Sequence, residues 1–185
     1  MACLPPPIMP TSISDTPLPE AAAECLARLA AAGISARTVR HAPVFTVEDA
    51  RSLRGDLAGL HVRNLFLSPI KGDGPDLLVT VEETRPVRIN PLLRAIGAPR
   101  MTMATPDRLM QRLGVRPGSV TPLGLIHAPP GSVRVLFDRT ILDAEGPVWM
   151  HPLDNSASTA LSAAGLRHFL AGLGHEVEQM PDETA

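Results

Sequence analysis

Two strand-like runs lying close together in the sequence constrain the fold more than any other feature. Residues 62–67 and 77–81 are rich in β-branched and other apolar side chains, and the segment between them contains Lys71-Gly72-Asp73-Gly74-Pro75, a composition typical of a turn. Two strands joined by so short a connection run antiparallel. The chain therefore contains a β-hairpin, and its fold is built around a sheet.

The sequence on either side of this hairpin predicts helices mixed with further strands. Apolar residues recur at helical spacing from Ala22 to Ala30, with Gly33 as the stop, and Asn90-Pro91 and Thr105-Pro106-Asp107 each place a capping residue before a proline. The expected helices span about 17–32, 46–53, 90–97, 105–114 and 162–173, and the expected strands span 34–40, 123–127, 133–138, 148–151 and 175–179. This order predicts an α/β fold (mixed α+β) of one domain, with a mixed, partly antiparallel central sheet surrounded by helices.

A single domain is also what a length of 185 residues predicts. Residues 1–16 contain four prolines together with small polar residues, a composition that cannot support a core. We therefore expect a flexible leader at 1–16, a folded domain at 17–180 and a flexible tail at 181–185.

Composition excludes several classes of protein. The chain has no tyrosine, one tryptophan and four phenylalanines, which are too few rings for a surface that stacks successive bases. Cys3 and Cys25 form neither a metal-ligand spacing nor a disulfide framework. The first ten residues lack the features of a secretory signal, and no run reaches the ~18 apolar residues of a membrane helix. A soluble, cytoplasmic protein is expected.

Arginine is concentrated in one part of the chain. Between Arg85 and Arg116 there are seven arginines and a single acid, Asp107, whereas the whole chain carries a formal net charge of -2. Such a segment either holds a phosphate backbone or forms ordinary solvated helix faces, and the sequence leaves both interpretations open. Sequence-specific DNA binding is disfavoured, because no helix-turn-helix pair with a basic recognition helix stands out.

Three segments, in this order, carry a resemblance to a known family: Gly59-Leu60-His61-Val62-Arg63-Asn64-Leu65-Phe66-Leu67, Gly118-Ser119-Val120-Thr121-Pro122 and His151-Pro152-Leu153-Asp154-Asn155. Supporting stretches lie at 41–46, at 113–117 and at Gly174-His175. Over roughly residues 20–178 the chain resembles the YbaK/ProX family, relatives of the editing domain of bacterial prolyl-tRNA synthetase. The resemblance implies a YbaK/aminoacyl-tRNA synthetase-associated domain fold. It also implies hydrolysis of the ester that links a wrong amino acid, typically alanine, to proline tRNA, without metal or cofactor.

The second segment, Gly118, Ser119, Val120, Thr121 and Pro122, is similar to the Gly-x-x-x-Pro loop of that family. Glycine permits close backbone approach and proline stiffens the exit, so the loop can present backbone N–H groups to an ester carbonyl. An aminoacyl ester is already activated, and orienting it while stabilising negative charge requires no strong side-chain nucleophile. These five residues are expected to be catalytic in that sense, and a plain turn is the alternative.

His151 follows a strand-like run and precedes Pro152, so its ring can project into a pocket at the strand end. In the family this His-Pro pair lines the amino-acid pocket, which implies a catalytic or size-limiting role for His151. The alternative is a structural histidine. His168 and His175 are seven residues apart and no His-x-x-x-His pair is present, so no metal site is expected.

Arg63 and Asn64 are expected to bind the end of the tRNA. Arg63 departs from the resemblance, because the family usually has lysine at this position and relies on it for activity. Arginine is always charged and binds phosphate with a planar fork, whereas lysine is a compact charge whose pKa shifts readily. The only lysine of the chain, Lys71, lies in the hairpin turn. Whether Arg63 replaces that lysine functionally is left open.

Other residues near the three segments are expected to be structural. Apolar side chains that flank the first segment are assigned to the core: Val44, Phe45, Leu65 and Leu67. A polar cluster after the His-Pro pair is interpreted as a turn: Asn155, Ser156, Ser158 and Thr159.

The leading hypothesis is a trans-editing deacylase for alanyl-tRNA(Pro). Its expected partners are the acceptor end of mischarged tRNA(Pro) and prolyl-tRNA synthetase, with no cofactor, no membrane and no specific DNA. Removal of another small amino acid, such as serine or threonine, is one alternative, because Arg63 departs from the usual lysine. A tRNA- or synthetase-binding module with weakened catalysis is the other.

Overall fold

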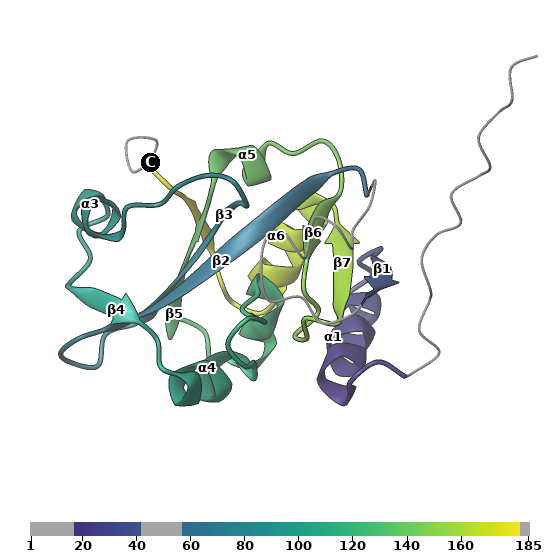
Figure 1. Ribbon diagram of the computed structural model, residues 1–185, viewed down its shortest axis with the longest axis horizontal. Coiled ribbons are helices and arrows are strands. Elements are labelled where there is room, and N and C mark those ends of the chain that lie inside the picture. The colour runs from purple at the N-terminus through teal and green to yellow at the C-terminus, as the bar shows by residue number, and fades with distance from the viewer. Residues whose placement is uncertain (1–16, 42–56, 182–185) are drawn as a thin grey trace, which may run out of the picture.

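The structure is a computed structural model that describes residues 17–41 and 57–181 (Figure 1). Its strands are β1 (Arg37–Arg40), β2 (Leu60–Pro69), β3 (Asp76–Glu82), β4 (Met101–Met103), β5 (Val133–Phe137), β6 (Val148–Met150), β7 (Ala157–Leu161) and β8 (Val177–Gln179). Its helices are α1 (Glu20–Ala31), α3 (Ile89–Ala95), α4 (Pro106–Leu113), the 3-10 helix η1 (Pro122–His127), α5 (Arg139–Leu142) and α6 (Ala163–Gly172). The leader expected at 1–16, the helix expected at 46–53 and the core residues expected at Val44 and Phe45 lie outside the described residues.

The strands form one mixed sheet in the order β1-β7-β6-β2-β3-β5-β8, with β4 paired to β2. The predicted hairpin is present as β2 and β3, which run antiparallel with Arg63 opposite Val81 and Leu67 opposite Leu77. The pairs β2 with β6, β3 with β5 and β5 with β8 are parallel. The predicted mixed α/β fold is therefore confirmed.

The sheet buries an apolar cluster on each face, because alternate residues of a strand point to opposite sides. Leu78 and Val135 belong to the larger cluster, which also holds residues of α1, α4, η1 and α6. Their neighbours Val79 and Leu136 belong to the smaller cluster, which is covered by α3. Figure 1 shows α1 and α3 at opposite ends of the molecule, in keeping with two separate clusters. Leu67 is fully buried, as predicted.

Local capping signals fix several helix ends. Thr105 accepts a hydrogen bond from the backbone N–H of Arg108 at 3.2 Å, and Ser162 accepts one from Gly165 at 3.0 Å, as is typical of helix starts. Gly114 ends α4 with a positive φ of 65°, a conformation that glycine adopts without steric cost. The cap predicted at Asn90 is wrong by two residues, since α3 begins at Ile89 with Arg88 as its cap.

The strand predicted at 123–127 is wrong, because this segment forms the 3-10 helix η1. Thr121 accepts a hydrogen bond from the Leu123 N–H at 3.3 Å, and Pro122 occupies the first helical position. Gly124 then packs against Leu113, where a Cβ would lie only 2.9 Å from the Leu113 Cβ and carbonyl oxygen. Capping and this close contact with α4 outweigh the strand-like composition.

The polar turn predicted over Ser158 and Thr159 is also wrong, because both residues lie in β7. The Thr159 hydroxyl lies 2.9 Å from the hydroxyl of Thr38 on β1, so the two polar side chains satisfy each other across the strand pair. On its other edge β7 pairs with the nearby β6, and β1 supplies Thr159 with a hydroxyl partner 121 residues away that local composition does not reveal. Strand β4 and helix α5 were not predicted.

Three of the seven arginines between Arg85 and Arg116 neutralise buried carboxylates. Asp76 is fully buried, and its oxygens accept hydrogen bonds from Arg108 at 3.0 and 3.1 Å and from Arg112 at 3.0 Å. Asp138 is also fully buried and forms an ion pair with Arg85. The arginine-rich segment is therefore partly structural, since these charges compensate burial inside the protein.

Two other ionisable groups are explained by their surroundings. Burial raises the pKa of the Cys25 thiol to about 12, so Cys25 behaves as a core residue and not as a nucleophile. The hydrogen bond from Arg134 lowers the pKa of Glu178 below its ordinary value. Because both of those side chains are substantially exposed, the pair contributes little to stability. Within the described ranges, no helix has the length and apolarity needed to span a membrane.

Replacing Asp76 tests the structural role of the arginines. Asp76→Asn removes the charge that Arg108 and Arg112 share, and we expect the free energy of unfolding to fall by about 3 kcal/mol. Urea denaturation measures the change, with Asp73→Asn in the exposed hairpin turn as the matched control, expected to change stability by less than about 0.5 kcal/mol. Equal effects of the two substitutions would contradict this role for Asp76.

Candidate functional site

The first and third motif segments meet where two parallel strands part. Strands β2 and β6 pair only at Leu60 with Val148 and at His61 with Trp149. The rings of His61 and Trp149 stack with centroids 6.1 Å apart and an interplanar angle of 8°. Because strand side chains alternate, Arg63 and His151, each two residues further on, project from the same face as this stack. A gap beside the ends of parallel strands is a common ligand site in α/β sheets.

Asn64 projects from the opposite face and reaches the second motif segment. Its Nδ2 donates a hydrogen bond to the carbonyl oxygen of Val120 at 2.9 Å. Its Oδ1 accepts a hydrogen bond from the Thr80 hydroxyl at 2.8 Å, and Thr80 is fully buried on β3. Both ends of the Asn64 amide are thus occupied, so the side chain holds the loop 118–122 in place against the sheet.

The loop 118–122 also contacts the third motif segment. Gly118 has a φ of 89°, and a Cβ there would lie 3.7 Å from the Asn155 Nδ2. The Ser119 N–H donates to the Arg116 carbonyl at 3.0 Å and closes a turn. The structure therefore brings all three predicted segments together, with the loop between Asn64 and Asn155.

The loop 118–122 provides backbone polar groups and no reactive side chain. Ser119 is 5% exposed and Thr121 is fully buried, with its hydroxyl accepting from the Leu123 N–H. The backbone N–H groups of Val120 and Thr121 donate no hydrogen bond to any group in the part of the chain that the structure describes. A backbone N–H of this kind can bind an anion or a polarised carbonyl oxygen where a ligand reaches it, and the N–H of half-buried Val120 is the better candidate because Thr121 is fully buried.

His151 is half-buried, and its environment defines its tautomer. Its Nδ1 lies 2.9 Å from the carbonyl oxygen of Ala157. Because a carbonyl oxygen only accepts, Nδ1 carries the proton in this contact, and Nε2 of the neutral ring is the acceptor nitrogen. The ring of His41 lies 6.3 Å away, and His41 Nε2 is 2.9 Å from the hydroxyl of Ser158.

Arg63 lies on the face opposite to Asn64 and is oriented by a different part of the chain. Its Nη2 donates a hydrogen bond to the carbonyl oxygen of Arg85 at 2.6 Å. Its Nε is buried and has no hydrogen-bond acceptor among the described residues. The two residues predicted to bind tRNA thus have different surroundings, and only Asn64 touches the loop 118–122.

Several residues of this region were not predicted from the sequence. His41 was noted only as the start of a supporting stretch, and Ser158 was placed in a turn. Thr80, His61 and Trp149 carried no signal of their own, because their importance comes from the partners that the sheet gives them. His175 is buried, with Nε2 3.1 Å from the Ala128 carbonyl, and in the described ranges no three His, Cys, Asp or Glu residues gather as a metal site.

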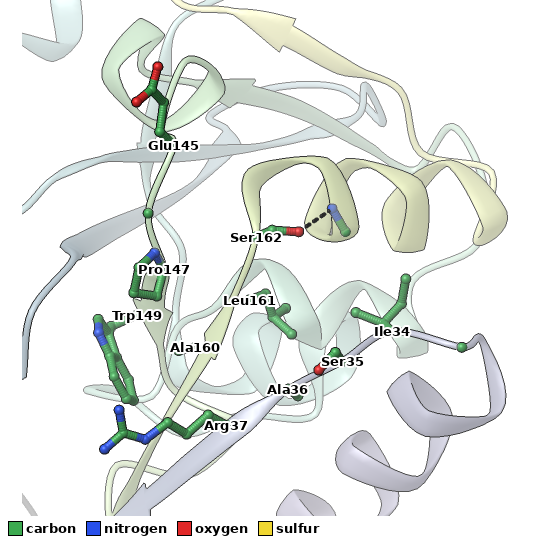
Figure 2. A pocket seen from close by; sticks show the side chains of 13 residues that line it. Ile34, Ser35, Ala36, Arg37, Glu145, Pro147, Trp149, Ala160, Leu161 and Ser162 are labelled. Carbon is green, nitrogen blue, oxygen red and sulfur yellow. Dashed lines mark hydrogen bonds between the residues drawn. The ribbon is translucent and has the colours of Figure 1, made fainter.

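A groove of about 510 Å³ lies next to this site (Figure 2). Its walls come from the segment before β1, the start of β6 and the junction of β7 with α6. Trp149 lines it, with the guanidinium carbon of Arg37 5.7 Å from the centroid of its ring. Figure 2 shows Ser162 turned back to the first turn of α6. None of the predicted site residues lines the groove.

Comparison with known proteins identifies the class of protein to which this fold and site belong. A model of the family described as "Aminoacyl-tRNA editing domain" matches residues 41–169, a span that includes all three motif segments. A sheet that gathers these segments around a backbone loop is thus that of an aminoacyl-tRNA editing domain.

Individual relatives narrow this class. The "Prolyl-tRNA synthetase associated domain-containing protein 1" of Danio rerio is 34% identical over 143 residues, 77% of each chain. The "Prolyl-tRNA editing protein ProX" of Acetoanaerobium sticklandii is 29% identical over 150 residues, 81% of this chain and 90% of that one. The crystal structure of a candidate trans-editing enzyme for prolyl-tRNA synthetase superposes with a TM-score of 0.69 at 21% identity, covering 90% of this chain and 99% of that one. The chain belongs to the YbaK/ProX family of aminoacyl-tRNA editing domains.

Replacing Asn64 tests how the loop is held. Asn64→Ala leaves the Val120 carbonyl without its donor and the buried Thr80 hydroxyl without its acceptor, so we expect a loss of about 1–3 kcal/mol in unfolding free energy. Hydrogen exchange at the Ser119 amide should become faster, because the turn from Arg116 to Ser119 loosens. Asn90→Ala, at an exposed position of α3, is the matched control. Unchanged Ser119 exchange in Asn64→Ala would show that another contact holds the loop.

Proposed function

We propose that this protein is a trans-editing deacylase that hydrolyses mischarged aminoacyl-tRNA, with alanyl-tRNA(Pro) as the first expected substrate. The observation that supports it best is the meeting of the three motif segments, through Asn64 on the Val120 carbonyl and Gly118 beside Asn155. Membership of the editing family supports the same reaction. We place the editing domain at 17–180, in the cytoplasm, with tRNA and prolyl-tRNA synthetase as partners.

The proposed chemistry uses orientation more than reactive groups. Water attacks the ester carbonyl carbon, the bond to the ribose oxygen breaks, and that oxygen takes a proton, which leaves a free amino acid and tRNA. The Val120 N–H would stabilise the negative charge that develops on the carbonyl oxygen. With Nδ1 on the Ala157 carbonyl, His151 would use Nε2 to orient the water or the ester.

Alanine is the first choice of amino acid because of size. A pocket excludes a larger side chain by steric conflict, whereas the loss of one methylene in a hydrophobic pocket costs only about 1–3 kcal/mol. A site that rejects proline and admits alanine therefore complements a synthetase that admits both. Serine and threonine are the other small candidates.

The second candidate function is a tRNA- or synthetase-binding module with weakened catalysis. One specific observation favours it: Arg63 stands where the family usually has lysine, and its Nη2 is engaged by the Arg85 carbonyl. An arginine in this arrangement retains phosphate affinity even if the family's lysine chemistry is lost.

A deacylation panel tests the first proposal. We expect release of labelled alanine from alanyl-tRNA(Pro), with prolyl-tRNA(Pro) left intact, and a loss of about 10²-fold in kcat/KM for His151→Ala. His168→Ala, exposed on α6, is the matched control and should leave release unchanged. Release no faster than in buffer for alanyl-, seryl- and threonyl-tRNA would overturn the deacylase proposal.

Arg63→Lys separates the two candidate functions. If the native chain is a deacylase, the variant should lower kcat/KM by about 10- to 100-fold, because the lysine ammonium lacks the planar fork that the Arg85 carbonyl orients. The binding-module proposal instead expects salt-sensitive tRNA binding without turnover in the native chain, and a large gain of turnover in Arg63→Lys. Rates of deacylation and tRNA binding at two salt concentrations measure both.

A further inference from the structure

The side chain of Arg63 is fixed by a backbone carbonyl, and that carbonyl belongs to another arginine. Arg63 Nη2 donates to the Arg85 oxygen at 2.6 Å, and Nε is buried with no acceptor in the part of the chain that the structure describes. The guanidinium therefore has one defined contact with the protein, and Nε cannot meet a ligand from solvent. The position of the Arg85 carbonyl therefore determines the direction of the remaining N–H groups of Arg63.

Arg85 is in turn clamped by a buried carboxylate. Its Nη1 forms an ion pair with Asp138, whose side chain is fully buried. Asp138 itself is held by its backbone N–H on the Thr80 carbonyl at 2.9 Å, and its Oδ1 also accepts from the Thr140 N–H at 3.2 Å. The second oxygen, Oδ2, is buried without a partner, so Arg85 is the one counter-charge that the described residues give this carboxylate.

The other buried carboxylate of the fold makes a useful comparison. Asp76 is equally buried and is paired with Arg108 and Arg112 on α4. Neither of those arginines contacts Arg63, whose described hydrogen bond goes to Arg85. Two ion pairs of similar burial thus differ in one respect: only the pair at Asp138 includes an arginine that contacts Arg63.

We propose that Asp138, acting through Arg85, is a positioning residue for the Arg63 guanidinium and so for the anionic end of a tRNA acceptor strand. The proposal deepens the proposed function and rests on it for the identity of the ligand. The ion pair fixes the turn after β3, the turn presents the Arg85 carbonyl, and the carbonyl orients Arg63. The Nη groups that remain then face a phosphate or ester oxygen in one fixed direction.

The test follows Arg63 directly by NMR in protein labelled with ¹⁵N-arginine. The Arg63 Nε–H signal is assigned by its absence in Arg63→Lys. In Asp138→Asn we expect its exchange with solvent to become at least about tenfold faster, because the clamp on the turn is lost. In Asp76→Asn, the matched control, the Arg63 signal should stay unchanged. Unaltered exchange in Asp138→Asn overturns the proposal.

A second variant covers the case in which Asp138→Asn does not fold. Arg85→Ala keeps the backbone carbonyl that Arg63 binds but removes the clamp, and it should accelerate Arg63 exchange similarly. If both single variants fold, the double variant should exchange no faster than either, because the two substitutions break the same contact. Additive effects of the two substitutions would contradict the relay.

Deacylation kinetics then separate this proposal from the proposed function. On the substrate that the native chain hydrolyses, Asp138→Asn should lower kcat/KM by about 10- to 100-fold, and Asp76→Asn should not. Faster Arg63 exchange with unchanged kcat/KM overturns the positioning role. A native chain that hydrolyses none of the tested tRNAs overturns the deacylase proposal, and the NMR comparison still decides whether Asp138 positions Arg63.

Discussion

The pairing of Asn64 on β2 with Thr80 on β3 is the contact on which the arrangement of the site depends. The Thr80 hydroxyl orients Asn64, which holds the loop 118–122. The Thr80 carbonyl accepts from Asp138, the residue that clamps Arg85. Buried polar groups must find partners, so a single fully buried threonine fixes structure on two sides of the first motif segment. A shift of one residue in this register would exchange the faces of Arg63 and Asn64.

The same arrangement explains why the proposed site has few reactive side chains. The loop presents backbone N–H groups, and its own hydroxyls are turned inward, with Thr121 capping η1. An activated ester requires fixed donors more than a nucleophile, so rigidity of the loop is itself the functional property. The arginines between Arg85 and Arg116 also have two kinds of role. Some compensate buried carboxylates and stabilise the fold, and others remain at the surface.

How much could be predicted from the sequence depended on the range of the interactions. The hairpin, the cap at Thr105 and the helix beginning near Ser162 were predicted correctly, because each is decided within a few residues. Strand β7 was missed because the composition of Ser158 and Thr159 is typical of a turn, and the side chains that satisfy them, His41 and Thr38, lie far away in the sequence. The roles of Thr80 and Asp138 depend on sheet register that no local pattern encodes. The motif segments were located, but which face each residue occupies required the sheet.

Arg63 shows how a substitution that looks conservative acquires its meaning from the surroundings. A lysine ammonium on a flexible side chain can adopt several contacts, whereas the planar guanidinium of Arg63 is oriented by its hydrogen bond to one carbonyl. That carbonyl is part of a turn whose position depends on a buried charge pair, which exists only because β3 and β5 lie side by side. The arginine is therefore a fixed feature of the sheet, and its direction depends on this rigidity as well as on its charge.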